Sequence, residues 1–289
     1  MTPLEDSLDG RQAEVTNTAA PDFENDHWTR SSFVRLLTLQ ELDGINRAPA
    51  QDSGAIPSTF VQYWHDSSAI PPDVRECMES WSPLQAHGVS MHVFDDVSGR
   101  RYIAENFGAR EVTAFDRCRH PAMRSDFFRM CFLVAEGGLY VDTDDVLCSA
   151  GWTELFARNT LKVQPLCYDI DAGAMLPAGD IRQSNLSTEN RIFYVNNNPL
   201  AAPAGHPILQ RALVRSIDIL LGADRKTEIQ STTGPGNLTV SLAAHAHDLQ
   251  MGGETPDFEI LVDWDSIADT RWNLGYRNDC RNWRNMDRT

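Results

Sequence analysis

The sequence predicts an α/β protein with a mostly parallel central sheet flanked by helices. Strand-like and helix-like segments alternate from residue 56 to residue 107, and an apolar helix at 121–136 leads directly into an apolar strand at 139–141. The composition, 42% hydrophobic and 23% charged over 289 residues, is that of a folded globular chain. Strands and helices that alternate at short spacing are typical of parallel sheets, because each helix carries the chain back across the sheet.

The N-terminal part differs from the rest. Residues 1 to about 28 are polar, acidic and aperiodic, which is typical of a tail without a stable structure of its own. Phe33, Leu36, Leu37 and Leu42 then recur at helical spacing and predict a short amphipathic helix at 29–45. We expect residues 1–50 to be an extension carrying this helix, either a docking arm or a cap on the domain edge, and residues 51–289 to be one domain.

The first elements of this domain are two strand and helix pairs. Residues 56–64 are rich in β-branched and aromatic residues and predict a strand, and 89–96 predict a second strand that ends on two aspartates. A proline pair opens the helix predicted at 71–84, and the second helix is expected at 99–107.

The helix predicted from Pro121 to the glycine pair at 137 and 138 is apolar on nearly every side, so it should be buried. Its polar exceptions, Ser125, Asp126 and Arg129, fall on one face. A narrow polar stripe on a buried helix must face a polar group, either a ligand or a purely structural ion-pair partner.

Three aspartates follow the apolar strand at 139–141, at the strand end where open α/β sheets bind ligands. If the strand continues, Asp142 and Asp144 point to one side and Asp145 to the other. Two neighbouring carboxylates repel each other unless a cation lies between them, and hard divalent cations such as Mg²⁺ or Mn²⁺ prefer oxygen ligands. The alternatives are a solvated loop or the cap of a helix near residue 153.

The later sequence predicts strands at 160–170 and 191–197. It then predicts a long amphipathic helix that ends at 221, and a glycine-rich turn followed by another helix within 232–249. The tail from 263 is dense in Trp, Asn, Asp and Arg, which is unusual for a free terminus.

The chain carries 25 basic and 41 acidic residues, a net charge of −16 that repels nucleic acids and anionic membranes. The six cysteines form no C-x-x-C pair and read as reduced thiols. We expect no membrane span and, by default, a cytoplasmic protein, although an exported effector would look the same.

The segment from 125 to 144 closely resembles the DXD glycosyltransferases of family 32, the capsular-polysaccharide type, and the catalytic core of the large clostridial glucosylating toxins. The likeness extends to the strand at 56–64, the helix after it, the Asn-rich segment at 195–209 and the Thr-Gly-Pro turn, so it covers roughly residues 55 to 240. The matching residues of the central motif are Ser125, Asp126, Arg129, Gly137, Gly138, Tyr140, Asp142 and Asp144.

This resemblance implies a GT-A fold and a metal-dependent retaining transfer of a hexose from a nucleotide diphosphate sugar, UDP-hexose first, to an unidentified glycan, small molecule or protein. By the same resemblance, Trp64 stacks on the base, and Ser125, Asp126, Arg129 and Tyr140 line the donor site. Asp142 contacts the ribose or sugar, and Asp144, with Asp142, binds Mn²⁺ or Mg²⁺. The implied catalytic residues are Asp126, Arg129, Asp142 and Asp144.

One part of the family pattern is missing, namely the C-terminal motif that completes the metal and diphosphate site. Trp272, Asn273 or Trp283 is a candidate substitute, and Arg271 or Arg277 a candidate diphosphate ligand.

Two other functions compete with transfer. A haloacid-dehalogenase-like phosphatase also has Asp-x-Asp after a strand but needs a lysine, and only Lys162 and Lys226 exist in the chain. The other is a non-catalytic sugar-nucleotide binder.

Overall fold

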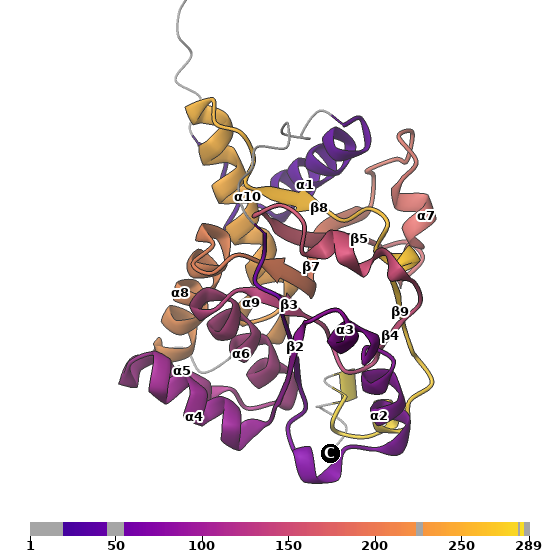
Figure 1. Cartoon of the computed structure of the whole chain (residues 1–289). Helices are drawn as coiled ribbons and strands as arrows, with labels where there is room; N and C mark the ends of the chain where they lie inside the picture. Colours follow the sequence, from indigo (N-terminus) through magenta and orange to yellow (C-terminus); the bar gives the residue numbers. More distant parts are fainter. Residues whose placement is uncertain (1–19, 45–54, 224–227, 283, 286–289) are drawn as a thin grey trace, which may run out of the picture.

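A seven-stranded mixed sheet runs through the computed structural model, which describes residues 20–44, 55–223, 228–282, 284 and 285. The strand order is β2-β1-β3-β7-β5-β6, and β8 also pairs with β5 (Figure 1). A separate two-stranded sheet joins β4 to β9. The strands are β1 Thr59–Tyr63, β2 Ser90–Phe94, β3 Gly138–Tyr140, β4 Asp145–Leu147, β5 Leu161–Asp169, β6 Ala174–Met175, β7 Arg191–Ala202, β8 Phe258–Ile260 and β9 Ala268–Thr270.

The prediction of a mostly parallel sheet flanked by helices is confirmed. β1 is parallel to both β2 and β3, and β5 is parallel to β8. The long strand β7 lies between β3 and β5 and is antiparallel to each of them, as β6 is to β5. β1, β2, β3, β5 and β8 therefore point one way, and the carboxyl ends of β1, β2 and β3 meet at one edge.

Helices cover both faces of the sheet. In Figure 1, α4, α5, α6, α8 and α9 lie to the left of the sheet and α2 and α3 to the right. The larger apolar core packs the buried faces of α6, α8 and α10 against β1, β5 and β7, and a smaller core holds Trp81, Leu84 and Trp264 on the opposite side. The helices are α1 His27–Leu42, α2 Pro72–Glu79, α3 Pro83–Ala86, α4 Asp96–Asn106, α5 Ala109–Arg117, α6 Pro121–Ala135, α7 Ala178–Ile181, α8 Pro207–Leu221, α9 Ile229–Thr232 and α10 Pro235–Gly252.

The N-terminal helix α1 packs against β7. Val34 and Leu37 are fully buried, and Arg35 donates hydrogen bonds to the carbonyls of Ile181 and Gln183. The helix therefore lies within a few residues of the predicted range and covers one part of the sheet. The predicted domain boundary at residue 50 falls outside the described residues.

The glycine pair between α6 and β3 is required by the backbone. Gly137 has φ +72°, and a Cβ atom there would lie 2.6 Å from the backbone nitrogen of Ala204. Gly138 has φ +112°, and its Cβ would lie 2.6 Å from the carbonyl oxygen of Thr59. Only glycine adopts these angles and allows this approach, so the chain can turn from the buried helix directly into the sheet.

Among the described helices, none combines the length and the apolar character needed to cross a bilayer.

Candidate active site

The predicted aspartates lie at the carboxyl end of β3, at the edge where β1 and β2 also end. β3 stops at Tyr140, and the amide of Asp145 donates to the carbonyl of Asp142, so Asp142 to Asp145 form a turn rather than a continued strand. The continued strand on which the alternating orientation was based is therefore absent, because this segment leaves the sheet and begins the separate strand β4. The predicted position at the strand end is correct.

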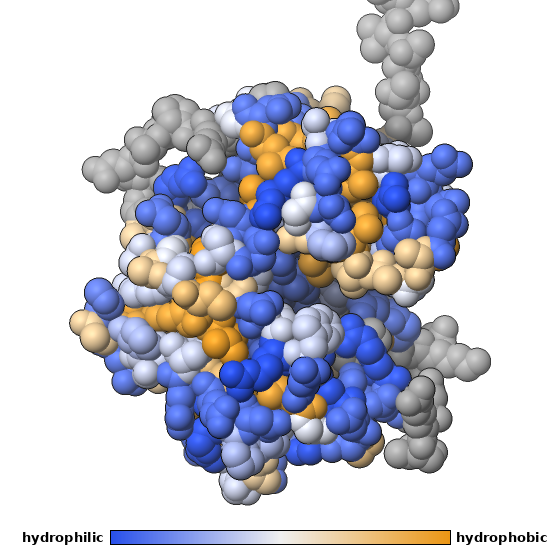
Figure 2. All heavy atoms as spheres, turned by 90° about the vertical axis from the view of Figure 1, so that its right-hand side faces the viewer, coloured by the Kyte–Doolittle hydropathy of each residue, from blue (hydrophilic) through white to orange (hydrophobic). Residues whose placement is uncertain are grey.

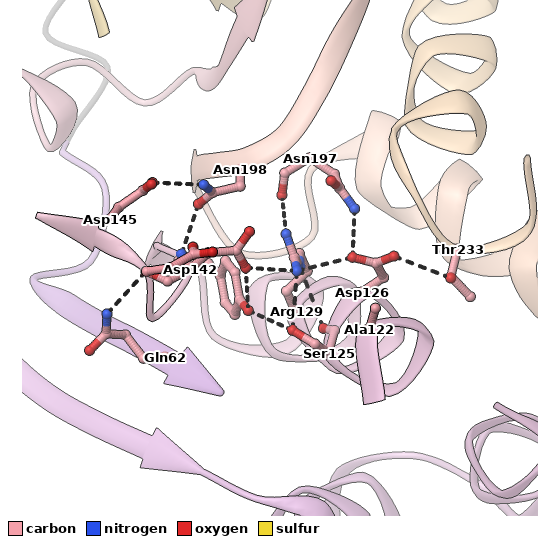
Figure 3. A network of polar contacts seen from close by, with 12 residues as sticks. Gln62, Ala122, Ser125, Asp126, Arg129, Asp142, Asp145, Asn197, Asn198 and Thr233 are labelled. Atoms are coloured by element: carbon pink, nitrogen blue, oxygen red, sulfur yellow. Dashed lines mark hydrogen bonds and ion pairs between the residues drawn. The ribbon is translucent and has the colours of Figure 1, made fainter. Parts of the chain in front are cut away.

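Arg129 is the centre of a buried polar network that joins α6, β3 and β7 (Figure 3). Its guanidinium donates to the carbonyl of Asn197 at 2.6 Å and to Ser125 Oγ at 3.1 Å, and it pairs at 3.0 Å with both Asp126 Oδ1 and Asp142 Oδ1. The side chain is 3% exposed and stacks on the Tyr140 ring, 4.2 Å from its centroid. The polar stripe on the buried helix therefore faces an aspartate and a strand carbonyl.

Asp126 is also buried in this network, at 7% exposure. Asn197 Nδ2 donates to it at 2.8 Å, and Thr233 Oγ1 donates at 3.4 Å. Burial raises the pKa of Asp126 to about 6, although the charge of Arg129 lowers it. Asp126 and Arg129 thus form the buried ion pair that was the structural alternative for this stripe, and through Arg129 this pair also orients Asp142.

Asp142 is held on one side and open on the other. Its Oδ1 accepts hydrogen bonds from Arg129 and from the Tyr140 hydroxyl, which also contacts Ser125 Oγ at 2.7 Å. Its backbone amide donates to Asn198 Oδ1 at 2.8 Å. The side chain is 35% exposed, so a ligand can reach its carboxylate.

Asp144 faces a segment that is distant in the sequence. Its Oδ2 accepts a hydrogen bond of 2.6 Å from the Tyr276 hydroxyl and pairs with Arg277. Burial raises the pKa of Asp144, and the nearby charge of Asp142 raises it further, whereas Arg277 lowers it. Arg277, one of the two arginines named from the sequence, therefore reaches the site, and Arg271 instead pairs with Glu76.

Asp145 is fully buried and belongs to the framework beneath the site. Its carboxylate accepts hydrogen bonds from Asn198 Nδ2 at 2.7 Å and Thr270 Oγ1 at 2.6 Å, which ties β4 to β7 and β9. Burial raises the pKa of Asp145 to about 7, and the charge of Asp144 acts in the same direction.

Trp64, predicted to stack on a nucleotide base, lies at the end of β1 and is 6% exposed. The Tyr276 ring packs edge-on against it, with centroids 5.2 Å apart, and Leu274 belongs to the same apolar cluster. Its indole Nε1 is buried without a hydrogen-bond partner. A base could stack on this ring only after Tyr276 had moved.

Three functional side chains were not predicted as site residues. Asn197 and Asn198 hold Asp126, Asp142 and Asp145, and Tyr276 contacts Asp144. The run of three asparagines within an otherwise apolar strand was a usable signal, because buried amides need partners. Of the proposed substitutes for the C-terminal motif, Trp272 stacks on Arg277 with a spacing of 4.5 Å, and Trp283 lies outside the described residues.

The donor set fits a hard divalent cation that is shared with a ligand. The partly exposed Asp142 and the buried Asp144 repel each other, and a cation between them would relieve this repulsion. Within the described part of the chain, no group of three or more His, Cys, Asp or Glu side chains is placed to bind a metal ion. The protein would therefore supply two carboxylates, and the remaining oxygen ligands would come from a phosphate and water.

Comparison with known proteins identifies the segment that contains these aspartates. Residues 71–160 match the family model described as a glycosyltransferase sugar-binding region containing a DXD motif. An uncharacterized glycosyltransferase of Acanthamoeba polyphaga mimivirus is 27% identical over 92 residues, which cover 32% of this chain and 36% of the viral protein. The solved PaToxG glycosyltransferase has a TM-score of 0.46 at 13% identity, over 88% of this chain and 94% of that one.

Proposed function

We propose that the chain is a metal-dependent glycosyltransferase, because residues 71–160 match the model of a glycosyltransferase sugar-binding region containing a DXD motif. It moves a hexose from a nucleotide diphosphate sugar, UDP-hexose first, to an acceptor hydroxyl that is unidentified. Retention of the anomeric configuration and the uridine base are part of this proposal because the family resemblance implies them, and the cytoplasmic location is its default expectation.

One observation carries the proposal, namely two aspartates at the carboxyl edge of the sheet inside the matched region, each held by its own partners. Arg129, Tyr140 and Asn198 fix Asp142, while Tyr276 and Arg277 contact Asp144 from the opposite side. Both carboxylates are positioned before any ligand arrives, which reduces the ordering that binding would require.

Each residue of the site has a role in the proposed transfer. Asp142 and Asp144 would hold the cation, which when bound supplies positive charge against the diphosphate as the sugar leaves. Arg129 and Tyr140 fix the direction of the Asp142 carboxylate, and the buried Asp126 keeps Arg129 in place. The Nε1–H group of Trp64 has no acceptor and would donate to an oxygen of the nucleotide.

Lys162, one of the two lysines of the chain, does not meet the requirement of the phosphatase alternative. Lys162, which would have to balance a phosphoaspartate, donates instead to the carbonyls of Ala157 and Arg158 and is almost fully buried. Lys226, the other lysine, lies outside the described residues. The lapsed-binder alternative differs from the enzyme only in turnover and is separated by the experiment below.

A thermal-shift screen tests the donor site. The purified chain is melted with UDP, GDP and their common hexose conjugates, each with and without Mn²⁺. We expect one nucleotide to raise the melting temperature only when Mn²⁺ is present, since a ligand specific for the native state stabilises it.

Turnover is then followed as release of the nucleotide diphosphate from the selected conjugate. Asp144→Asn is expected to abolish the metal-dependent release and to keep the native fold. Binding without release would support the lapsed binder, and no shift with any nucleotide would refute the donor site.

A further inference from the structure

The segment at residues 271–282, here called the C-terminal strap, closes one side of the site. Outside the site it is anchored on α2, where the Gly275 amide donates to Asp73 Oδ2 at 2.8 Å and Arg271 pairs with Glu76 at 3.1 Å. Leu274 is buried in one cluster with Trp64.

The second anchor lies near the other end of the strap. The Cys280 carbonyl lies 3.0 Å from His120 Nε2, at the start of α6. The strap is thus held at both ends by contacts that do not involve the side chains of Asp142 and Asp144, and the Arg271 amide also donates to the Asp144 carbonyl at 2.8 Å.

Between these anchors, the strap places a cation on a predicted metal ligand. The Arg277 guanidinium pairs with Asp144 Oδ2, the same oxygen that accepts the hydrogen bond from Tyr276. The guanidinium also lies over the Trp272 ring. Asp144 therefore has a positively charged partner that comes from the protein itself.

Two unsatisfied donors mark the same place. Over the whole described part of the chain, Trp64 Nε1 and Arg277 Nε are the buried side-chain nitrogen or oxygen atoms that lack a hydrogen-bond partner. A buried donor without an acceptor costs free energy, and such a group in a native protein calls for an explanation such as a bound water, an ion or a functional role. Tyr276 connects the two, since its ring packs against Trp64 and also lies near the Arg277 guanidinium. Two N–H groups without acceptors point to a ligand rich in oxygen acceptors, as a nucleotide diphosphate is.

We propose that Arg277 is a displaceable counter-ion of Asp144. It occupies the carboxylate oxygen that a divalent cation would take, and it leaves Asp144 for a phosphate oxygen of the donor when cation and donor bind together. This inference rests on the proposed function and deepens it by giving the strap a role in cation binding. A guanidinium and a divalent cation repel each other and compete for one carboxylate, so the cation alone binds weakly until the arginine has another anion to pair with.

The test measures Mn²⁺ binding to the full chain without nucleotide, by electron paramagnetic resonance of the free ion. Arg277→Gln removes the competing charge and is expected to tighten Mn²⁺ binding about tenfold. Arg281→Gln is the matched control, because Arg281 lies in the same strap and loses the same charge but pairs with Asp279. Its Mn²⁺ affinity should stay within about twofold of the wild type, given screening of exposed charges by salt.

A second variant keeps the test independent of folding defects. Tyr276→Phe removes the other strap contact with Asp144 Oδ2 without a change of charge, and a gain in Mn²⁺ affinity smaller than that of Arg277→Gln is expected. Melting curves show whether each variant is native. If native Arg277→Gln binds Mn²⁺ no more tightly than Arg281→Gln, or if neither the wild type nor Arg277→Gln binds it, the proposal is wrong.

Adding UDP gives a further readout. In the wild type, UDP should tighten Mn²⁺ binding, because it offers Arg277 a phosphate, and in Arg277→Gln this coupling should fall several-fold. Equal coupling in both proteins would contradict the transfer of Arg277 to the donor.

The outcomes also separate this inference from the proposed function. If Mn²⁺ binding responds to Arg277→Gln but no sugar nucleotide is turned over, the transferase assignment fails and the counter-ion role stands. If a sugar nucleotide is turned over but Arg277→Gln leaves the Mn²⁺ affinity unchanged, the transferase assignment stands and the counter-ion role fails.

Discussion

The charge of Arg129 is stable in the interior because two carboxylates, a hydroxyl and a carbonyl surround it. Arg129→Met should destabilise the protein by about 3–5 kcal/mol near pH 8, since it leaves Asp126 buried without its counter-charge. The loss should shrink as the pH falls from 8 toward about 6, because without the charge of Arg129 the pKa of Asp126 lies above its wild-type value of about 6 and the buried carboxyl takes up a proton. Urea unfolding at pH 8 and pH 5 measures both effects.

The double variant Arg129→Met, Asp126→Asn is the control, because it removes both charges together. It should recover part of the stability at pH 8. No recovery, with an equal loss at both pH values, would mean that Arg129 acts by packing alone.

Asp145 gives the molecule a dependence of stability on pH. Burial raises its pKa to about 7 from an unfolded value of 3.8. Because the folded pKa is the higher one, this stabilising contribution is complete below about pH 4 and is lost as the pH rises through 7. The wild type should therefore lose on the order of a few kcal/mol of unfolding free energy across this window.

Asp145→Asn cannot ionise, so its stability should change much less between pH 4 and pH 7. Denaturant unfolding of both proteins at pH 4.5, 6 and 8 makes the comparison. Parallel pH profiles would place the titrating group elsewhere.

At the level of elements, the features with local signals were predictable and those that depend on distant pairing were not. The α6 helix, its polar stripe and the glycine turn follow from spacing within about 20 residues. The insertion of β7 between β3 and β5 pairs β7 with a strand some 60 residues earlier, β3, and no local pattern encodes its direction. For the same reason the aspartates were found from the sequence, whereas Asn197 and Asn198, which hold them, were not predicted as site residues.

The turn between α6 and β3 tests whether glycine is needed for its angles or for its size. Gly137→Ala should cost more than about 3 kcal/mol, because it adds a backbone clash to the strain of a positive φ. Gly253→Ala is the matched control, since Gly253 has a similar φ of +67° but nothing within 4 Å of its Cβ position. Its cost should be about 1 kcal/mol. Equal losses in thermal unfolding would show that the close contact at Gly137 is unimportant.

At the level of the whole molecule, the site depends on segments from most of the chain. Asp142 and Asp144 come from the β3–β4 turn, their asparagine support from β7, and Tyr276 and Arg277 from the strap near the C-terminus. The class of fold was predictable, because alternating strands and helices already imply it. The joining of the strap to Asp144 was not, because it is a contact over 132 positions in the chain, set by the packing of Leu274 and Tyr276 on Trp64 and α2.

The division of the chain at residue 50 leads to a prediction about the whole molecule. A chain that starts at residue 51 lacks α1 and so loses the buried side chains of Val34 and Leu37 and the hydrogen bonds of Arg35 to the segment after β6. Each buried aliphatic side chain contributes about 1.5–3 kcal/mol, so the shortened chain should lose several kcal/mol and melt at a clearly lower temperature. A chain that starts at residue 20 keeps every described contact of α1 and is the control. If both chains melt together, α1 is a separable arm and the predicted boundary is correct; if only the shorter one is destabilised, α1 belongs to the folded domain.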